Sequence, residues 1–466
     1  MRLLALLFAF LALAARAQAL PDTVTEVLKR AGIPAESVSA VVEPAGGGAP
    51  LISVNAAKPM NPASVMKLVT TFAALDMLGP AYTFKTDVLA AGPVAGGVLD
   101  GDLVLRGGGD PKLTYDRLWI LLAQLRSRGV REIRGNVVLD RSFFAPVAHD
   151  AALFDNEPRR AYNVGPDALL LNFKAATIRL VPEKGAVRAS LDPDLPSIEL
   201  HTRLKLVEGA CGDWRERLKL EVDEQDLLAT MQVSGNFAAS CGERAWPVSL
   251  YDADRYASVI FRSLWSQLGG RFNGKVVSGR APDSAELLIA FESEPLSNLV
   301  RDINKYSNNV MARQVFLTLS AAPPAQAGEA AASERVVKGW LKGRGLDFPE
   351  LVMENGSGLS RKERLSAKNM AALLQEAWKS AVMPELMSSL PITAVDGTFK
   401  RRFGNGAAAG QSHLKGGTLT GVRSIAGWVL DRKGRRWVVA MTINDARAGA
   451  AQGALEALVE WVAQRN

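Results

Sequence analysis

The chain has 466 residues, of which 48% are hydrophobic, so it has enough apolar material for the cores of two or three domains. Basic residues exceed acidic ones only slightly, 55 Lys and Arg against 48 Asp and Glu, for a formal net charge of +7. Because this excess is spread out, it excludes the basic surface typical of nucleic-acid binding and favours only weak association with an anionic cell-wall or membrane surface. The three histidines, His149, His201 and His413, are too scattered for a metal cluster, and we expect no metal and no cofactor.

The first residues have the pattern of a secretory signal peptide. Arg2 precedes an apolar run from Leu3 to Ala15, and Ala17-Gln18-Ala19 is a small-x-small cleavage site. We therefore predict a signal peptide at 1–19 and export to the periplasm or cell envelope, the alternative being an uncleaved amphipathic anchor. No later run of about 18 apolar residues predicts a membrane span.

The segment after the signal predicts strands at 37–43 and 51–54, followed by a buried helix. Pro62 precedes this helix, expected from Ala63 to Leu78, and Gly79 with Pro80 ends it. Its apolar residues lie on nearly all sides, which indicates a helix in the middle of a domain.

From about residue 84 to 247 the sequence pattern predicts mainly β-strands. Short alternating runs at 97–106, 132–139, 175–181 and 197–207 are separated by Gly and Pro turns, and one helix is expected at 115–128. Cys211 and Cys241 are the two cysteines, and in an exported chain we expect one disulfide between them, the alternative being two separate buried thiols.

The second half of the chain returns to a helical pattern. Helices are expected at 254–268, 296–319, 366–379 and in a segment running through Leu341. Strands at 424–430 and 435–443 flank the turn at 431–434 and predict a hairpin, after which an amphipathic helix ends the chain.

Three short motifs follow one another along the chain: Ser64-Val65-Met66-Lys67, Ser307-Asn308-Asn309 and Lys415-Gly416-Gly417-Thr418. Each has an ordinary alternative, namely a lysine snorkelling from a helix end, a polar loop and a strand-entry turn. The first places a serine near the positive end of a helix dipole and a lysine on the same helical face. Together they indicate acyl transfer by a serine that is activated without histidine, whereas a Ser-His-Asp triad has no local signature here.

These motifs make the chain resemble the D-alanyl-D-alanine carboxypeptidase/endopeptidase family, the low-molecular-mass class C penicillin-binding proteins. The resemblance extends over the whole mature chain, and the long interval between Ser64 and Ser307 fits an insertion that simple serine β-lactamases lack. It is carried further by residues 101–103, 107–111, 162–163, 168–172, 355–361, 391–392 and 396–398.

The resemblance implies an α/β fold. A penicillin-binding domain, with an antiparallel sheet between helices, would be formed by residues 20–85 and 260–466. The β-rich insertion at 86–259 would contain two subdomains.

It also implies hydrolysis of the D-Ala-D-Ala end of peptidoglycan stem peptides, cleavage of peptide cross-links and covalent binding of β-lactam antibiotics. Ser64 would attack the scissile carbonyl, with Lys67 as the base. Ser307 would relay a proton to the leaving amine, and Asn309 would bind a substrate amide and fix Lys67.

The third motif would hold the other end of the substrate. Lys415 and Thr418 would bind the terminal carboxylate, the N–H groups of Ser64 and Thr418 would form the oxyanion hole, and Gly417 would let the substrate backbone approach. The resemblance further places Asp140, Arg361 and Thr420 in the pocket for a diamino-acid side chain.

Gly416 departs from the family, which usually carries Thr or Ser there. We therefore expect weaker binding of substrate or penicillin, with the chemistry retained. The alternatives are a serine β-lactamase of the same fold, against which stands the lack of a recognisable deacylation Glu, and a non-catalytic wall-binding protein, which only Gly416 favours.

Overall fold

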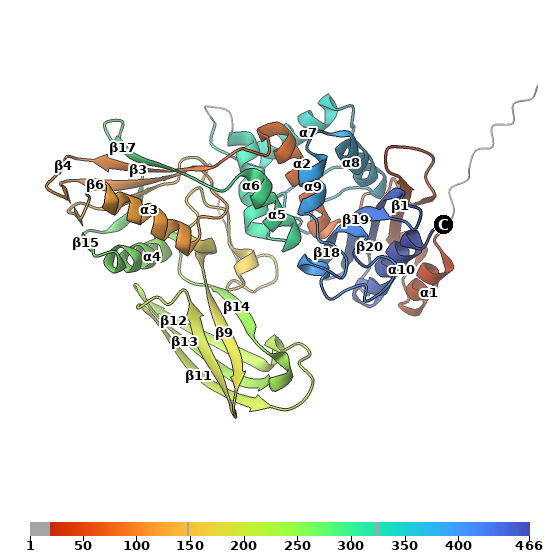
Figure 1. Cartoon of the computed structure of the whole chain (residues 1–466), viewed down its shortest axis with the longest axis horizontal. Helices are drawn as coiled ribbons and strands as arrows, with labels where there is room; N and C mark the ends of the chain where they lie inside the picture. Colours follow the sequence, from red (N-terminus) through yellow and green to blue (C-terminus); the bar gives the residue numbers. More distant parts are fainter. Residues whose placement is uncertain (1–18, 147–148, 322–325) are drawn as a thin grey trace, which may run out of the picture. The chain divides into compact units, whose positions relative to one another are not determined.

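The computed structural model describes residues 19–146, 149–321 and 326–466 (Figure 1). The predicted signal peptide therefore lies outside the described residues, apart from Ala19. The chain divides into two compact units. The terminal unit comprises Met1–Val65, Leu346–Val352 and Lys362–Asn466, and the central unit comprises Met66–Gly345 and Met353–Arg361. The domain boundaries expected at 85/86 and 259/260 stay predictions.

The terminal unit contains a five-stranded antiparallel sheet in the order β18-β19-β20-β1-β2. The expected strands near the N-terminus and the C-terminal hairpin are confirmed, but the third motif lies inside a strand and is not an entry turn. The bounds are β1 Val38–Pro44, β2 Ile52–Val54, β18 Ser412–Leu419, β19 Val422–Leu430 and β20 Arg436–Asn444.

Helices cover this sheet because its strands are apolar on both faces. Residues of β20 are buried throughout its interior, and alternate ones, such as Val439 and Met441, join the core beneath α1 (Asp22–Arg30) and α10 (Gln452–Ala463). These two helices pack side by side in Figure 1, while α8 (Ala367–Lys379) packs on β1 and β20 and is followed by α9 (Met383–Ser389).

In the central unit, three helices pack around the buried helix α2 (Lys67–Leu78). They are α5 (Leu296–Lys305), α6 (Asn309–Ala321) and α7 (Ala330–Gly343). Every residue from Lys67 to Leu75 is buried, as the apolar pattern predicted, and the helix ends at Gly79. The helical segment expected at 296–319 consists of two helices, and the polar loop considered for the second motif lies between them, where Ser307 has a positive φ of 56°.

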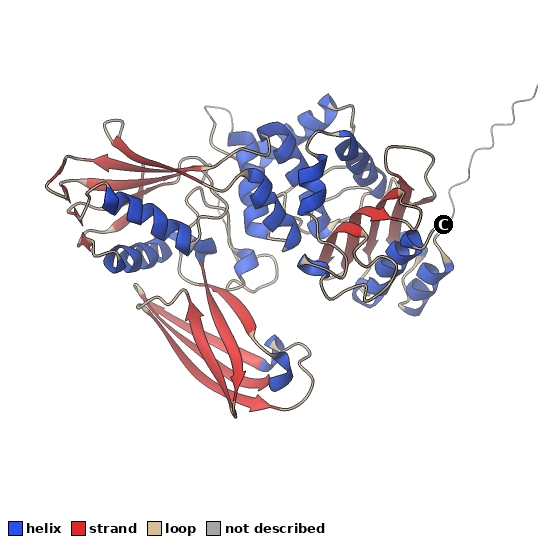
Figure 2. Cartoon of the chain, viewed as in Figure 1, coloured by secondary structure: helices blue, strands red, loops and turns tan. Residues whose placement is uncertain are grey.

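The rest of the central unit is β-rich, as predicted, and Figure 2 draws the segment from Ala175 to Ser249 mostly as strands. A five-stranded sheet and a four-stranded sheet accompany α3 (Tyr115–Ser127) and α4 (Ala253–Gln267). The five-stranded sheet contains, in order, β16 Val276–Gly279, β8 Val137–Asp140, β6 Asp102–Gly107, β3 Lys85–Ala91 and β17 Glu286–Glu292. The four-stranded sheet contains β15 Arg271–Phe272, β7 Glu132–Ile133, β5 Val98–Leu99 and β4 Val94–Ala95.

Two three-stranded sheets complete this unit. One has the order β10-β9-β14 (Ala186–Asp192, Ala175–Glu183, Arg244–Ser249) and the other β11-β13-β12 (Ile198–Val207, Leu228–Ala238, Leu218–Gln225). Cys211 and Cys241 are joined by a disulfide, with 4.7 Å between their Cα atoms. This bond ties the loop after β11 to the end of β13 and so limits the freedom of that loop.

Candidate active site

Ser64 lies in a 3₁₀ turn, η2 (Ala63–Met66), that leads directly into α2. The backbone before it is tightly held in the terminal unit. Asn444 on β20 accepts from the Asn61 N–H at 2.8 Å and donates to its carbonyl at 3.0 Å, while Ser424 Oγ donates to Pro62 O at 2.6 Å. Ala63 has a positive φ of 46°, so the turn that presents Ser64 is strained and is maintained by these bonds.

Strand β18 passes close to the same backbone. A Cβ atom added at Gly417 would lie 2.2 Å from Ser424 Oγ and 2.6 Å from Pro62 O. Position 417 therefore has room only for glycine, and this close approach brings the third motif beside the segment that precedes Ser64.

Lys415 lies two residues before Gly417 on β18 and is fully buried. Its Nζ donates to the carbonyl of Gly416 at 2.8 Å. Burial lowers the pKa of Lys415 to about 7, because desolvation disfavours the charged ammonium. A lysine in this state gains or loses its charge near neutral pH, and a bound anion favours the charged form.

Lys67 is the first residue of α2, and its side chain joins three segments of the central unit. Nζ donates to Asn309 Oδ1 at 2.6 Å and also to the carbonyl of Ser357. Because Asn309 begins α6, the first motif and the last residue of the second are in direct contact.

Ser357 was not among the predicted site residues, although it lies in the segment 355–361 that carries the resemblance and that contains the predicted Arg361. Gly356 has a φ of 67°, and a Cβ there would lie 2.5 Å from Phe316 Cγ, so this turn requires glycine. Thr70 Oγ1 donates to Gly356 O at 2.6 Å, which fixes the loop on α2. The Gly-Ser-Gly sequence at 356–358 indicates a tight turn, but nothing in it identifies the carbonyl that Lys67 contacts.

Ser307 lies in the break between α5 and α6. Its left-handed backbone is uncommon for a residue other than glycine, and such strain is concentrated at functional positions. Asn308 caps α6 by accepting from the Met311 N–H at 3.1 Å. The residues of this turn line a cavity of about 680 Å³.

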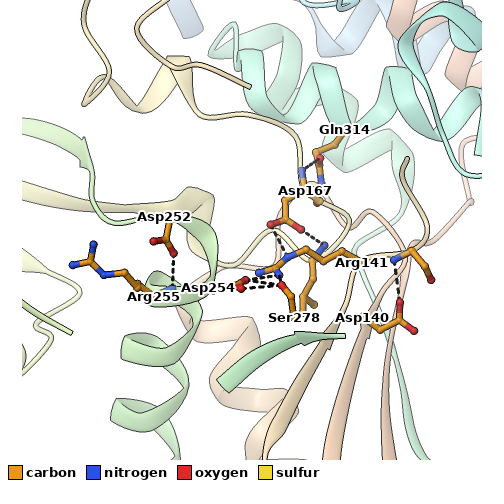
Figure 3. Close-up of polar contacts among 10 residues, drawn as sticks. Asp140, Arg141, Asp167, Asp252, Asp254, Arg255, Ser278 and Gln314 are labelled. Carbon is orange, nitrogen blue, oxygen red and sulfur yellow. Dashed lines mark hydrogen bonds and ion pairs between the residues drawn. The ribbon is translucent and has the colours of Figure 1, made fainter. Parts of the chain in front are cut away.

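A chain of polar contacts fixes α6 in the central unit (Figure 3). Gln314 on α6 accepts from the Asp167 N–H at 2.9 Å and donates to its carbonyl at 2.7 Å. The Asp167 carboxylate accepts from Arg141 at 2.9 Å, and Arg141 donates to Asp254 at 2.6 Å. The helix that begins at Asn309 is thus anchored to the end of β8 and to α4.

The three residues expected in the diamino-acid pocket lie in different surroundings. Asp140 is 3% exposed, and its carboxylate accepts from the N–H groups of Ser142 and Ala281 at 3.0 and 2.9 Å. Although burial raises the pKa of Asp140, these hydrogen bonds hold it below its usual value. The Arg361 guanidinium lies 4.9 Å from the Phe154 ring centroid, and Thr420 is exposed in the β18–β19 turn. Their role in substrate binding stays a prediction.

Within the described ranges, no helix has both the length and the apolar character that crossing a bilayer requires.

The fold and these motifs define a serine D-Ala-D-Ala carboxypeptidase of the penicillin-binding class. The chain belongs to the D-Ala-D-Ala carboxypeptidase 3 (S13) family, whose model matches residues 20–465. It is 29% identical over 394 residues to the D-alanyl-D-alanine carboxypeptidase DacB of Haemophilus influenzae, covering 83% of this chain and 81% of the relative. It is 28% identical over 457 residues to a D-alanyl-D-alanine carboxypeptidase of Actinomadura sp., covering 95% and 84%.

Solved structures agree with this assignment. The crystal structure of penicillin binding protein 4 (dacB) from Haemophilus influenzae matches with a TM-score of 0.76 at 26% identity, over 95% of this chain and 99% of that one. The same protein complexed with a β-lactam matches with a TM-score of 0.73 at 25% identity, over 96% and 100%. The predicted penicillin-binding α/β fold with a β-rich insertion is thereby confirmed.

Proposed function

We propose that this carboxypeptidase acts through an acyl-enzyme on Ser64. Lys67, in its neutral form, takes the Ser64 hydroxyl proton as Oγ bonds to the scissile carbonyl carbon. The C–N bond then breaks, and D-alanine leaves with a proton relayed through Ser307. Water next attacks the ester and restores the Ser64 hydroxyl, so that one peptide bond is hydrolysed in each cycle.

The observation that carries this proposal is the 2.6 Å hydrogen bond between Lys67 Nζ and Asn309 Oδ1. A buried lysine that is held in place close to a serine in the preceding turn is suited to proton transfer. The close approach of Gly417 to Pro62 supports a role for β18 in the same reaction, because it sets the strand beside the backbone that presents Ser64.

We further propose that Lys415 and Thr418 bind the terminal carboxylate, and that β-lactams acylate Ser64 in place of the peptide. The charged form of Lys415 is suited to an anion, and Thr418 is an exposed residue on the same strand. A β-lactam complex of the Haemophilus influenzae relative supports the second point.

Endopeptidase action on cross-links is also proposed, because its substrate needs room beyond a short stem peptide. The cavity of about 680 Å³ beside the Ser307 turn offers such room. We propose export to the periplasm on the basis of the N-terminal sequence pattern.

The experiment is to measure free D-alanine released from a D-Ala-D-Ala stem peptide and, separately, the monomeric peptides released from a cross-linked dimer. Wild-type enzyme should release D-alanine from the first and split the second, and Ser64→Ala should do neither. Release of D-alanine by Ser64→Ala at the wild-type rate would refute the mechanism. Release from the stem peptide with no cleavage of the dimer would refute only the endopeptidase part.

A further inference from the structure

Two arginines of the β-rich region line the same cavity as the catalytic turn. The cavity of about 680 Å³ is bordered by the turn from Ser307 to Asn309 and also by Arg160 and Arg215. A second cavity of about 480 Å³ is lined by the same two arginines. All of these residues belong to the central unit. The arginines and the turn that contains Ser307 therefore line one cavity.

The Arg215 side chain forms no ion pair within the described part of the chain, although Asp213 and Glu216 line the smaller cavity with it. Arg160 contacts Glu157 at 3.3 Å, and the buried Nε of Arg215 has no hydrogen-bond partner among the described residues. Burial and the nearby charge of Arg160 lower the pKa of Arg215.

Two acids, Asp116 and Asp192, also line the larger cavity, and Asp192 is engaged by Arg179 at 2.5 Å. Asp213, in the smaller cavity, partly offsets the fall in the Arg215 pKa and accepts from the Arg215 backbone N–H at 3.2 Å. Two guanidinium groups that line the same two cavities favour an anion there.

Arg215 is held on a rigid support. Its guanidinium lies 5.2 Å from the Trp214 ring centroid, and that ring makes edge contacts with Phe237 and Trp246 at 6.1 and 6.0 Å. Arg217 donates to the carbonyl of Cys211, whose disulfide with Cys241 closes the loop. The position of Arg215 is thus fixed before any ligand arrives, which lowers the entropy cost of binding.

Arg160 is tied to the catalytic helix. The Asn163 N–H donates to Arg160 O at 2.9 Å, and Arg313 on α6 donates to Val164 O at 2.9 Å. Because α6 begins at Asn309, the segment that carries Arg160 has a fixed relation to the second motif.

We propose that Arg160 and Arg215 form a subsite for a free carboxylate of the wall peptide, remote from the scissile bond. The planar guanidinium groups match a carboxylate in shape and charge. This inference deepens the proposed function and rests on it. It gives the β-rich region a role in selecting long, anionic peptides over short ones.

The test uses two D-Ala-D-Ala peptides that are identical except that one has a free carboxylate, distant from the scissile bond, where the other has an amide. Wild-type enzyme should cleave the carboxylate form with a kcat/KM about tenfold higher, mainly through KM, as expected for a charge-assisted hydrogen bond. In the Arg160→Gln, Arg215→Gln double variant the ratio should fall to about one. Arg203→Gln is the matched control, because Arg203 is exposed on β11 and borders neither of these cavities.

Acylation by benzylpenicillin distinguishes failure of the subsite from failure of the Ser64 mechanism, since this small ligand does not carry the distant carboxylate. It should proceed at the wild-type rate in the double variant. Equal cleavage of the two peptides by wild-type enzyme would overturn the subsite, and this comparison needs no variant to fold. A carboxylate preference that survives in the double variant would also overturn it. Absence of acylation in the wild type would instead overturn the Ser64 mechanism and the inference with it.

Discussion

Lys67 Nζ and Asn309 Oδ1 lie 2.6 Å apart although 242 residues separate them in the chain. The contact joins the start of α2 to the start of α6 inside the central unit. Lys67 is fully buried, so loss of this partner would leave a polar group inside the protein with fewer hydrogen bonds. The same bond therefore contributes both to the stability of the unit and to the position of the proposed base.

Substitution of Asn309 by alanine tests this contact. We expect acylation by benzylpenicillin to slow by roughly 10- to 100-fold, because the base is no longer held, and the free energy of unfolding to fall by about 1–3 kcal/mol. Stopped-flow acylation and urea unfolding measure the two effects. Asn369→Ala is a suitable control, since Asn369 binds Glu350 at 2.9 Å in the terminal unit. An unchanged acylation rate in Asn309→Ala would contradict the role.

Gly417 should not tolerate even a methyl group. Gly417→Ala would place Cβ 2.2 Å from Ser424 Oγ, so we expect a loss of about 1–3 kcal/mol in stability and a large fall in acylation. Gly339→Ala is the control, because it lies within α7 with no atom within 4 Å of the added Cβ, and it should stabilise by about 0.5–1 kcal/mol. Thermal unfolding and acylation rates check both variants, and a fully active Gly417→Ala would refute the steric argument.

Gly416 has more room than Gly417. An added Cβ would lie 3.0 Å from Phe399 Cζ, a contact that requires a small shift of that buried ring. If the missing hydroxyl weakens carboxylate binding, Gly416→Ser should acylate several-fold faster than Gly416→Ala, which has the same Cβ but no hydroxyl. Equal rates for the two variants would show that the hydroxyl does not matter here.

Carboxylate binding should depend on pH through Lys415. Burial lowers the pKa of Lys415 to about 7, so in the free enzyme its positive charge is present below that pH and lost above it. The affinity of Ser64→Ala, which binds without reacting, for a D-Ala-D-Ala peptide should therefore fall as the pH rises above about 7. Titration calorimetry from pH 6 to 9 measures this, and adding Lys415→Met should remove the pH dependence. An affinity that stays constant in the Ser64→Ala background would contradict the assignment.

The sequence predicted those elements whose signals are local. The end of the predicted helix at Leu78, before Gly79, and the C-terminal hairpin, which has a clear turn, are found within a residue or two. The predicted start at Ala63 is instead a 3₁₀ turn in which Ala63 has a positive φ, and α2 begins at Lys67. The polar residues of the second motif indicated a loop between two helices, but no local signal predicted the positive φ of Ser307.

The contacts that build the site depend on long-range packing. The motif order indicated that Lys67 and Asn309 belong to one chemistry, but not that Ser357 O shares the lysine. One of the backbone N–H groups that donate to the Asp140 carboxylate belongs to Ala281, far along the chain, and no local sequence pattern predicts this hydrogen bond. Short motifs thus identify the reacting groups, whereas the packing that positions them becomes visible only in the structure.

The most direct test of Ser64 as the nucleophile is the intact mass of the protein after addition of benzylpenicillin. We predict one lasting adduct with the mass of one penicillin on the wild-type enzyme and none on Ser64→Ala. An adduct of the same mass on Ser64→Ala would contradict the account, because another residue would then be the one acylated. Consumption of penicillin by the wild type without any adduct would contradict the lasting acyl-enzyme and would indicate a serine β-lactamase.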